Sequence, residues 1–164
     1  MYSLAVKNRA TQFIKDYGKG IAQAIRGTGL FFPAIVAQKA LESGWGTSGL
    51  TKEANNFGGI KYNPNIHEAF VVSDTSEVVK GKKVRVPNVK FAKFTDPTEG
   101  IKKHFQVLMA DRYKNARLNA KSPEEQIKML VQAGYSTMNP TAYVNLMKGN
   151  ISRVRKLLPF GRIA

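Results

Sequence analysis

The sequence has no cysteine among its 164 residues. This excludes a disulfide framework, a thiolate metal site and a cysteine nucleophile. No apolar run approaches the ~18 residues that a membrane-spanning helix needs. Residues 1–17 lack the continuous apolar core of a secretory signal peptide. We therefore expect neither a membrane span nor a signal peptide, which leaves the route to any extracellular target open.

Signals for a metal or nucleotide site are also missing. The only two histidines, His67 and His104, lie far apart, and neither belongs to a cluster with the spacing of metal ligands. His104 falls within an apolar helical pattern, so a structural role is expected for it. No glycine-rich phosphate loop precedes a predicted helix. The sequence therefore predicts no metal and no cofactor.

Acidic residues are scarce. Eleven Asp and Glu stand against 26 Lys and Arg, which gives a formal net charge of +15. A surface this basic favours an anionic partner. Nucleic acid, acidic cell-wall polymers and membrane surfaces all fit that charge. The basic residues are scattered, however, and no known nucleic-acid-binding motif is present, so we do not expect a nucleic-acid partner.

The length and the order of patterns predict one domain over residues 1–164. Apolar spacing predicts helices over 10–26 and 33–43. Residues 57–95 instead carry β-branched and aromatic runs around the turn at Lys80-Gly81, which predicts a small antiparallel β-lobe. Three Pro-containing capping signals then open helices, at Asp96, Ser122 and Asn139. The fold class is therefore α+β, dominated by helices.

Glu42 is the acid that invites a chemical role. It stands in the last turn of an apolar helix, where the negative end of the helix dipole disfavours its charged form. Apolar surroundings would raise its pKa further. A carboxylic acid that stays protonated near neutral pH suits general-acid catalysis on a glycosidic oxygen. The alternative is that Glu42 is an exposed residue at a helix end.

The residues after Glu42 suggest a sugar site. Trp45, the only tryptophan, lies between Gly44 and Gly46, so its ring has room to stand out of a loop as a sugar platform. The amides in the segment 55–61 are suited to bind acetamido or hydroxyl groups, and its glycines allow close backbone approach. The alternatives are a core tryptophan and an Asn- and Gly-rich turn that enters the β-lobe.

Residues 37–46 (AQKALESGWG), then 55–61 (NNFGGIK), then 133–137 (AGYST) with Tyr143 downstream, closely resemble the glucosaminidase family of peptidoglycan hydrolases. This family includes bacterial autolysins and the wall-cutting part of the flagellar rod-capping protein. The resemblance runs from about residue 10 to 158. It implies a lysozyme-like α+β fold with a substrate groove between a helical lobe and a β-lobe. It also implies endo-β-N-acetylglucosaminidase cleavage of the β-1,4 bond after N-acetylglucosamine.

The resemblance assigns roles by position. Glu42 matches the catalytic acid, and Tyr135 matches the family's tyrosine. The second, debated carboxylate matches Glu77 in a Thr-Ser-Glu segment ahead of a glycine turn, and Glu68 is its rival. We expect Tyr135 to lie close to Glu42, and Glu77 to approach only when glycan closes the groove. The expected substrate-binding residues are Trp45, Asn56, Phe57, Lys61 and Tyr143.

Two departures from the family pattern concern the groove. Gly58 stands where the family usually has Phe, which predicts a wall that is more open or filled by Phe57. Ser136 and Met138 replace the usual Ala and Asp near the tyrosine. Alternatives on the same fold are a muramidase or a lytic transglycosylase, and the latter would release an anhydro product.

The resemblance also implies where the protein acts and on what. The expected partner is the glycan strand of bacterial peptidoglycan, met by a monomer at the cell wall, in the periplasm or outside the cell. A phage-borne lysin and a domain of a larger exported chain are both compatible with the sequence.

Overall fold

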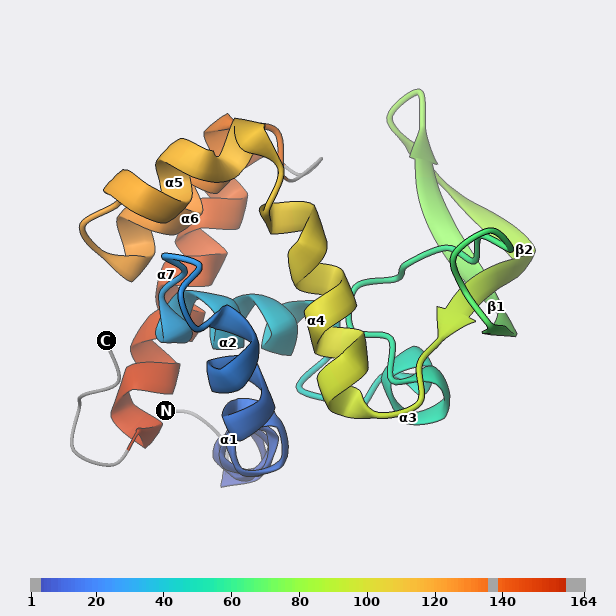
Figure 1. Ribbon diagram of the computed structural model, residues 1–164, viewed down its shortest axis with the longest axis horizontal. Helices are drawn as coiled ribbons and strands as arrows, with labels where there is room; N and C mark the ends of the chain where they lie inside the picture. The colour runs from blue at the N-terminus through green and yellow to red at the C-terminus, as the bar shows by residue number, and fades with distance from the viewer. Residues whose placement is uncertain (1–3, 136–138, 159–164) are drawn as a thin grey trace.

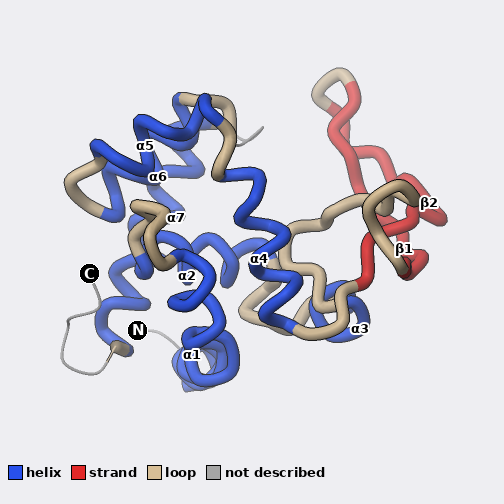
Figure 2. The backbone as a smooth tube through the Cα atoms, in the orientation of Figure 1, coloured by secondary structure: helices blue, strands red, loops and turns tan. Residues whose placement is uncertain are grey.

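A computed structural model describes residues 4–135 and 139–158 of the chain. Its elements separate into a helical part and a β-hairpin joined by loops (Figures 1 and 2). In chain order they are α1 (Leu4–Ile25), α2 (Phe32–Glu42), α3 (Gly49–Ala54), β1 (Ala69–Val79), β2 (Lys82–Lys93), α4 (Pro97–Leu108), the 3-10 turn η1 (Asp111–Tyr113), α5 (Lys114–Asn119), α6 (Pro123–Gln132) and α7 (Pro140–Leu157).

Helix α2 is the centre of the helical part. All nine residues from Phe32 to Ala40 are buried, as expected for a helix that is apolar all round. Helices α1, α6 and α7 pack against it, and the ribbon shows α2 enclosed by them (Figure 1). Only its last residues, Leu41 and Glu42, emerge from this core.

Side-chain caps begin three of the later helices. The Asp96 carboxylate accepts a hydrogen bond from the Glu99 amide at 2.8 Å, and the Glu99 carboxylate accepts one from the Thr95 amide at 2.8 Å. Ser122 caps α6 and Asn139 caps α7 in the same way. These caps satisfy amides that the first turn of a helix leaves free, and they confirm the three helix starts predicted from the sequence.

The two strands form one antiparallel hairpin, with Val79 paired to Lys82 across the Lys80-Gly81 turn. Lys80 and Gly81 both have positive φ, as a tight hairpin turn requires. Most hairpin side chains are exposed, and only Phe91 and Ala92 near its base are buried. The hairpin contacts α3 near its base and projects away from the other helices, and α4 lies between it and the helical part (Figure 1).

Candidate active site

Glu42 is the last residue of α2, and the turn that follows is held by one hydroxyl group. The Ser43 hydroxyl donates to the Lys39 carbonyl at 2.6 Å and accepts from the Gly46 amide at 3.0 Å. The Trp45 amide also donates to the Ala40 carbonyl at 2.7 Å. These bonds satisfy the end of α2 and fix the point at which Glu42 leaves the core.

Three side chains surround the Glu42 carboxylate. The Tyr135 hydroxyl donates to Oε1 at 2.7 Å. Lys39 Nζ lies 3.3 Å from Oε2, and His104 Nδ1 lies 3.4 Å from the same oxygen. A quarter of the Glu42 side chain stays exposed, whereas those of Lys39 and His104 are buried. Glu42 is thus the accessible member of a closely packed polar cluster.

The charge state of Glu42 differs from the sequence-based expectation. Burial alone raises the pKa of its carboxyl, as predicted. The positive charge of Lys39 and the hydrogen bonds from Lys39 and Tyr135 outweigh burial, so the pKa lies below its usual value. The expectation of a raised pKa was therefore wrong for the free protein, because it did not include the neighbouring cation.

Lys39 is a fully buried lysine whose ammonium group lies between an acid and an aromatic ring. Its Nζ is 5.2 Å from the centroid of the Phe105 ring and 3.3 Å from Glu42 Oε2. Burial lowers the pKa of Lys39 to about 8, even though Glu42 opposes the shift. At neutral pH it is still mainly charged and neutralises the carboxylate.

A pocket of about 460 Å³ opens above this cluster. Its lining comes from the end of α2, the segment before the hairpin, α4, and the two tyrosines near α7: Glu42, Gly58, Ile60, His104, Val107, Tyr135 and Tyr143. Burial raises the pKa of the Tyr135 phenol and raises that of Tyr143 to about 12, so both stay protonated. Burial also lowers the pKa of His104 to about 4. The pocket thus combines one carboxylate with neutral hydrogen-bonding groups.

The structure brings Glu42, Tyr135 and Tyr143 together, although Tyr135 follows Glu42 by 93 residues. Tyr135 lies where the resemblance predicted it, with its hydroxyl on the carboxylate. Ser136 and Met138, the departures beside this tyrosine, lie outside the described residues.

Trp45 does not line this pocket. Its half-buried ring packs edge-on against Phe13 with centroids 6.0 Å apart. The Arg153 guanidinium lies 5.4 Å from the centroid of the same ring. The flanking glycines permit the left-handed backbone of this turn. The expected exposed sugar platform is therefore replaced by a ring packed against α1.

Asn56 and Phe57 are structural in this molecule. The Asn56 amide donates to the carbonyls of Ile60 and Ala92, at 3.0 and 2.9 Å, and its side-chain oxygen accepts from the Ile60 amide at 3.0 Å. These bonds tie the loop to β2 and occupy the groups expected to bind substrate. Phe57 is buried against Tyr17, with centroids 5.0 Å apart, and does not fill the space beside Gly58.

Lys61 and Glu77 pair with each other rather than with Glu42. Lys61 Nζ lies 2.7 Å from Glu77 Oε1, and both side chains are largely exposed. Neither residue lines the pocket that contains Glu42. In this state Glu77 is held on the hairpin by a surface ion pair.

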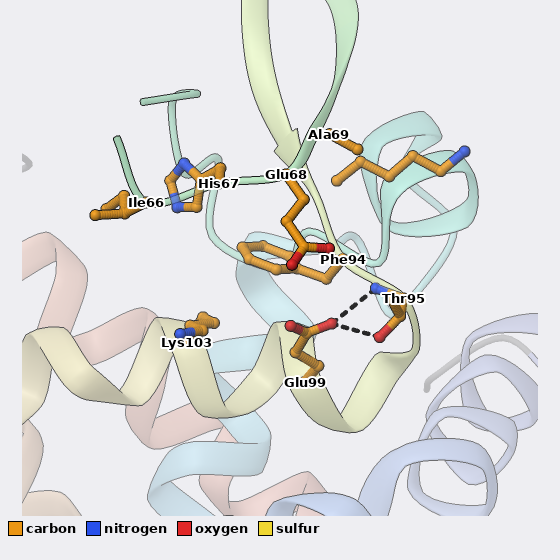
Figure 3. Close-up of a pocket in the computed structure, with 9 residues that line it drawn as sticks. Ile66, His67, Glu68, Ala69, Phe94, Thr95, Glu99 and Lys103 are labelled. Carbon is orange, nitrogen blue, oxygen red and sulfur yellow. Dashed lines mark hydrogen bonds between the residues drawn. The ribbon is translucent and has the colours of Figure 1, made fainter. Parts of the chain in front are cut away.

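Glu68, the rival second acid, lines a separate hollow of about 260 Å³ between the base of the hairpin and the start of α4. Figure 3 shows its carboxylate directed toward Glu99, whose own carboxylate accepts hydrogen bonds from Thr95. Lys103 lines the same hollow. Glu99 and Lys103 lie on the face of α4 that continues to Val107 in the Glu42 pocket, so the two hollows follow one helix.

Sequence reasoning missed two members of the cluster, Lys39 and His104. Lys39 lies three residues before Glu42 on the same helix, a spacing that brings side chains together. His104 lies on the buried stripe of α4 with Ile101, Phe105 and Leu108. A charged residue in an otherwise buried helix and a histidine on an apolar stripe were the signals available.

The described residues contain no group of three or more His, Asp or Glu that could hold a metal ion. Within the same part of the chain, no helix is both long and apolar enough to cross a membrane.

The sequence is similar to those of known proteins. The glucosaminidase family model, described as mannosyl-glycoprotein endo-beta-N-acetylglucosaminidase, matches residues 18–156. The chain is 33% identical over 132 residues to exo-glucosaminidase LytG of Bacillus subtilis, covering 77% of this chain and 46% of the relative. It is 32% identical over 108 residues to peptidoglycan hydrolase FlgJ of Pseudomonas aeruginosa, covering 63% and 27%. The chain thus spans less than half of either relative.

Solved structures show the same fold. The catalytic domain of the autolysin Auto from Listeria monocytogenes superposes with a TM-score of 0.76 at 26% identity, covering 96% of this chain and 97% of that one. A truncated glycoside hydrolase domain of Salmonella typhimurium FlgJ gives a TM-score of 0.72 at 24% identity, covering 90% and 98%. The expected lysozyme-like α+β architecture is confirmed. With the family model spanning most of its length, the chain belongs to the glucosaminidase family of glycoside hydrolases.

Proposed function

We propose that this protein is a peptidoglycan hydrolase that cleaves the β-1,4 bond after N-acetylglucosamine as an endo-β-N-acetylglucosaminidase. The observation that carries the proposal is the Glu42 carboxyl group, exposed at the base of a pocket and hydrogen-bonded at 2.7 Å to Tyr135. Residues 1–164 act as one catalytic domain. The enzyme works as a monomer on glycan strands of the wall, outside the cytoplasmic membrane and without a nucleic-acid partner.

Glu42 delivers the proton to the glycosidic oxygen. The free carboxyl is mainly ionised at neutral pH because of Lys39 and the hydrogen bond from Tyr135. Glycan that covers its exposed quarter removes water from the carboxyl group, which favours the protonated form. After the transfer, the Tyr135 hydroxyl and Lys39 stabilise the carboxylate that remains. Once the bond from the anomeric carbon to the protonated oxygen has broken, water adds to that carbon and gives its proton to the Glu42 carboxylate, which restores the acid.

The direct test is Glu42→Gln on purified sacculi. The amide keeps the size of the side chain but has no transferable proton, so activity should fall by ~10²–10⁴-fold. Glu53→Gln, on the exposed surface of α3, is the matched control and should retain wild-type activity. More than about a tenth of wild-type activity in Glu42→Gln would contradict the assignment.

Analysis of the products by mass spectrometry tests the bond and the mode of cleavage. A reducing N-acetylglucosamine end supports the proposal, whereas an anhydro-muramic end identifies a lytic transglycosylase and a reducing muramic end a muramidase. Long fragments early in the digestion indicate endo cleavage. Early release of small fragments alone would indicate an exo-acting enzyme.

A further inference from the structure

His104 is the buried residue that the mechanism above leaves without a task. It lies on α4, and its ring bridges two groups of the site. Nε2 is 3.2 Å from the Tyr135 hydroxyl, and Nδ1 is 3.4 Å from Glu42 Oε2. Together with the 2.7 Å bond from Tyr135 to Glu42 Oε1, these contacts close a ring of three side chains, in which Nδ1 approaches the carboxylate without a hydrogen bond.

The hydrogen bonds in this ring have a defined direction. A phenol has one proton, and that of Tyr135 goes to Glu42. The Tyr135 oxygen must therefore accept at its other contact, which requires the proton of His104 to be on Nε2. His104 thus fixes the rotation of the Tyr135 hydroxyl, so that its proton points at the carboxylate.

The fold makes space for this imidazole at Gly58. A Cβ atom added there would lie 2.0 Å from Nδ1 and 2.1 Å from Cε1 of His104. Gly58 is not among the glycines with positive φ, so its backbone conformation does not itself demand glycine. The side chain is absent because the ring occupies its place. Gly58 is also where this sequence departs from the family pattern.

We propose that His104 is a positioning residue for glycan hydrolysis, which holds the Tyr135 hydroxyl as a hydrogen-bond donor to Glu42, and that Gly58 is the glycine that admits its ring. The inference rests on the proposed function. Lys39 and Tyr143 complete the surroundings of the cluster. Among the described residues, the Tyr135 hydroxyl hydrogen-bonds with Glu42 and His104 only, so the orienting role falls to His104.

The test is a double-mutant cycle measured as kcat on soluble glycan strands. His104→Leu removes the donor to Tyr135 and should lower kcat about tenfold or more, the effect of ~1.4 kcal/mol in the barrier. His104→Gln places an amide N–H where Nε2 lies and should stay within about threefold of wild type. In a Tyr135→Phe background, His104→Leu should cost less than about twofold, because the hydroxyl it orients is gone.

Equal losses in His104→Leu and His104→Gln, or a full tenfold loss in the Tyr135→Phe background, would overturn the proposal, because a packing role predicts both. Far-UV circular dichroism and thermal unfolding check that each variant folds. If His104→Leu does not fold, His104→Asn replaces it, because its shorter amide does not reach the Nε2 position. Asn as active as Gln would then refute the role. Inactive wild type on sacculi would instead refute the proposed function.

Gly58→Ala provides an independent arm. The added methyl group should displace the His104 ring and lower kcat about as much as His104→Leu does. In a His104→Ala background the same change should have little further effect, because the space is empty. An equal loss in both backgrounds would show that Gly58 serves the backbone rather than the ring.

Discussion

At the scale of single residues, the site depends on the balance around one carboxyl group. Burial favours the neutral form of Glu42, whereas Lys39 favours the charged form and prevails in the free protein. Replacing both Lys39 and Glu42 by apolar groups would cost little stability, whereas leaving either one buried without its partner would be strongly destabilising. The pair is therefore retained for chemistry rather than for stability.

This balance predicts that kcat and kcat/KM decline at different pH values on the alkaline side of their pH profiles. A general acid works only when protonated, so the rate falls as pH rises through its pKa. The alkaline decline of kcat/KM reports the pKa of Glu42 in the free enzyme, where that pKa is lowered. The alkaline decline of kcat reports its pKa in the complex, where glycan excludes water and raises it. In steady-state assays on soluble glycan strands, kcat should therefore decline at a higher pH than kcat/KM does.

Lys39→Met supplies the internal comparison for these profiles. It removes the cation while keeping an unbranched side chain. The pKa of Glu42 should then rise, so the alkaline decline of kcat/KM should move to higher pH. If kcat and kcat/KM of the wild type decline at the same pH, glycan does not raise the pKa of Glu42. If the decline of kcat/KM does not move in Lys39→Met, Lys39 does not lower that pKa.

At the scale of elements, the hairpin differs from the helices because it has little core of its own. Val72, Val78, Val79 and Val84 are exposed along it, and the Lys61–Glu77 ion pair lies on its surface. Exposed ion pairs contribute at most about 1 kcal/mol. A movement of the hairpin over glycan, which would carry Glu77 toward the site as we propose, would therefore meet little energetic opposition.

The two candidates for the second acid give a clear comparison on sacculi. If Glu77 acts after closure, Glu77→Gln should lower kcat at least about tenfold, by analogy with other catalytic carboxylates. Glu68→Gln should have a small effect, because Glu68 lines the separate hollow against Glu99. A large loss in Glu68→Gln alone would transfer the role to Glu68, and near-wild-type rates in both would leave Glu42 as the only acid.

The sequence predicted the elements that carry local signals. Proline with Asp, Ser or Asn caps predicted the starts of α4, α6 and α7, and the Lys80-Gly81 turn predicted the hairpin. Helices α3 and α5, of six residues each, are too short for an apolar period to show and were not predicted. Short helices take their stability from the packing around them.

The site was predictable only where a motif marked it. Glu42 and Tyr135 are 93 residues apart, and only the resemblance joined them in advance. The contacts of His104 with both depend on how α4 packs beside the end of α2, which no local pattern encodes. Asn56 was expected to bind substrate, but an amide is equally suited to bind backbone. Its side chain bonds to three backbone groups of Gly58 and Ile60 in its own loop and to the Ala92 carbonyl of β2.

At the scale of the whole molecule, the excess of 15 positive charges is largely uncompensated. Among the described residues, the surface ion pairs Lys61–Glu77, Arg85–Asp74 and Arg155–Glu124 engage only a few of the 26 basic side chains. The remaining positive charge attracts anionic polymers over a distance that shortens as the salt concentration rises.

Binding of the Glu42→Gln variant to sacculi should therefore weaken steeply as salt rises from about 0.05 to about 0.5 M, since screening shortens the reach of exposed charges to a few ångströms. Co-sedimentation measures this without the complication of hydrolysis. Retention that does not change with salt would exclude electrostatic adsorption. Salt-sensitive binding to DNA but not to sacculi would favour the nucleic-acid alternative.

The burial of α2 has an evolutionary consequence. The position of Glu42 is fixed by nine buried residues that precede it on α2, so large changes among them should destabilise the whole fold. The hairpin shares almost none of that core, and Asn56 ties only its base to the preceding loop. We therefore expect natural variants of this protein to differ more along the hairpin than around Glu42, because changes on the hairpin disturb little of the core that holds the acid in place.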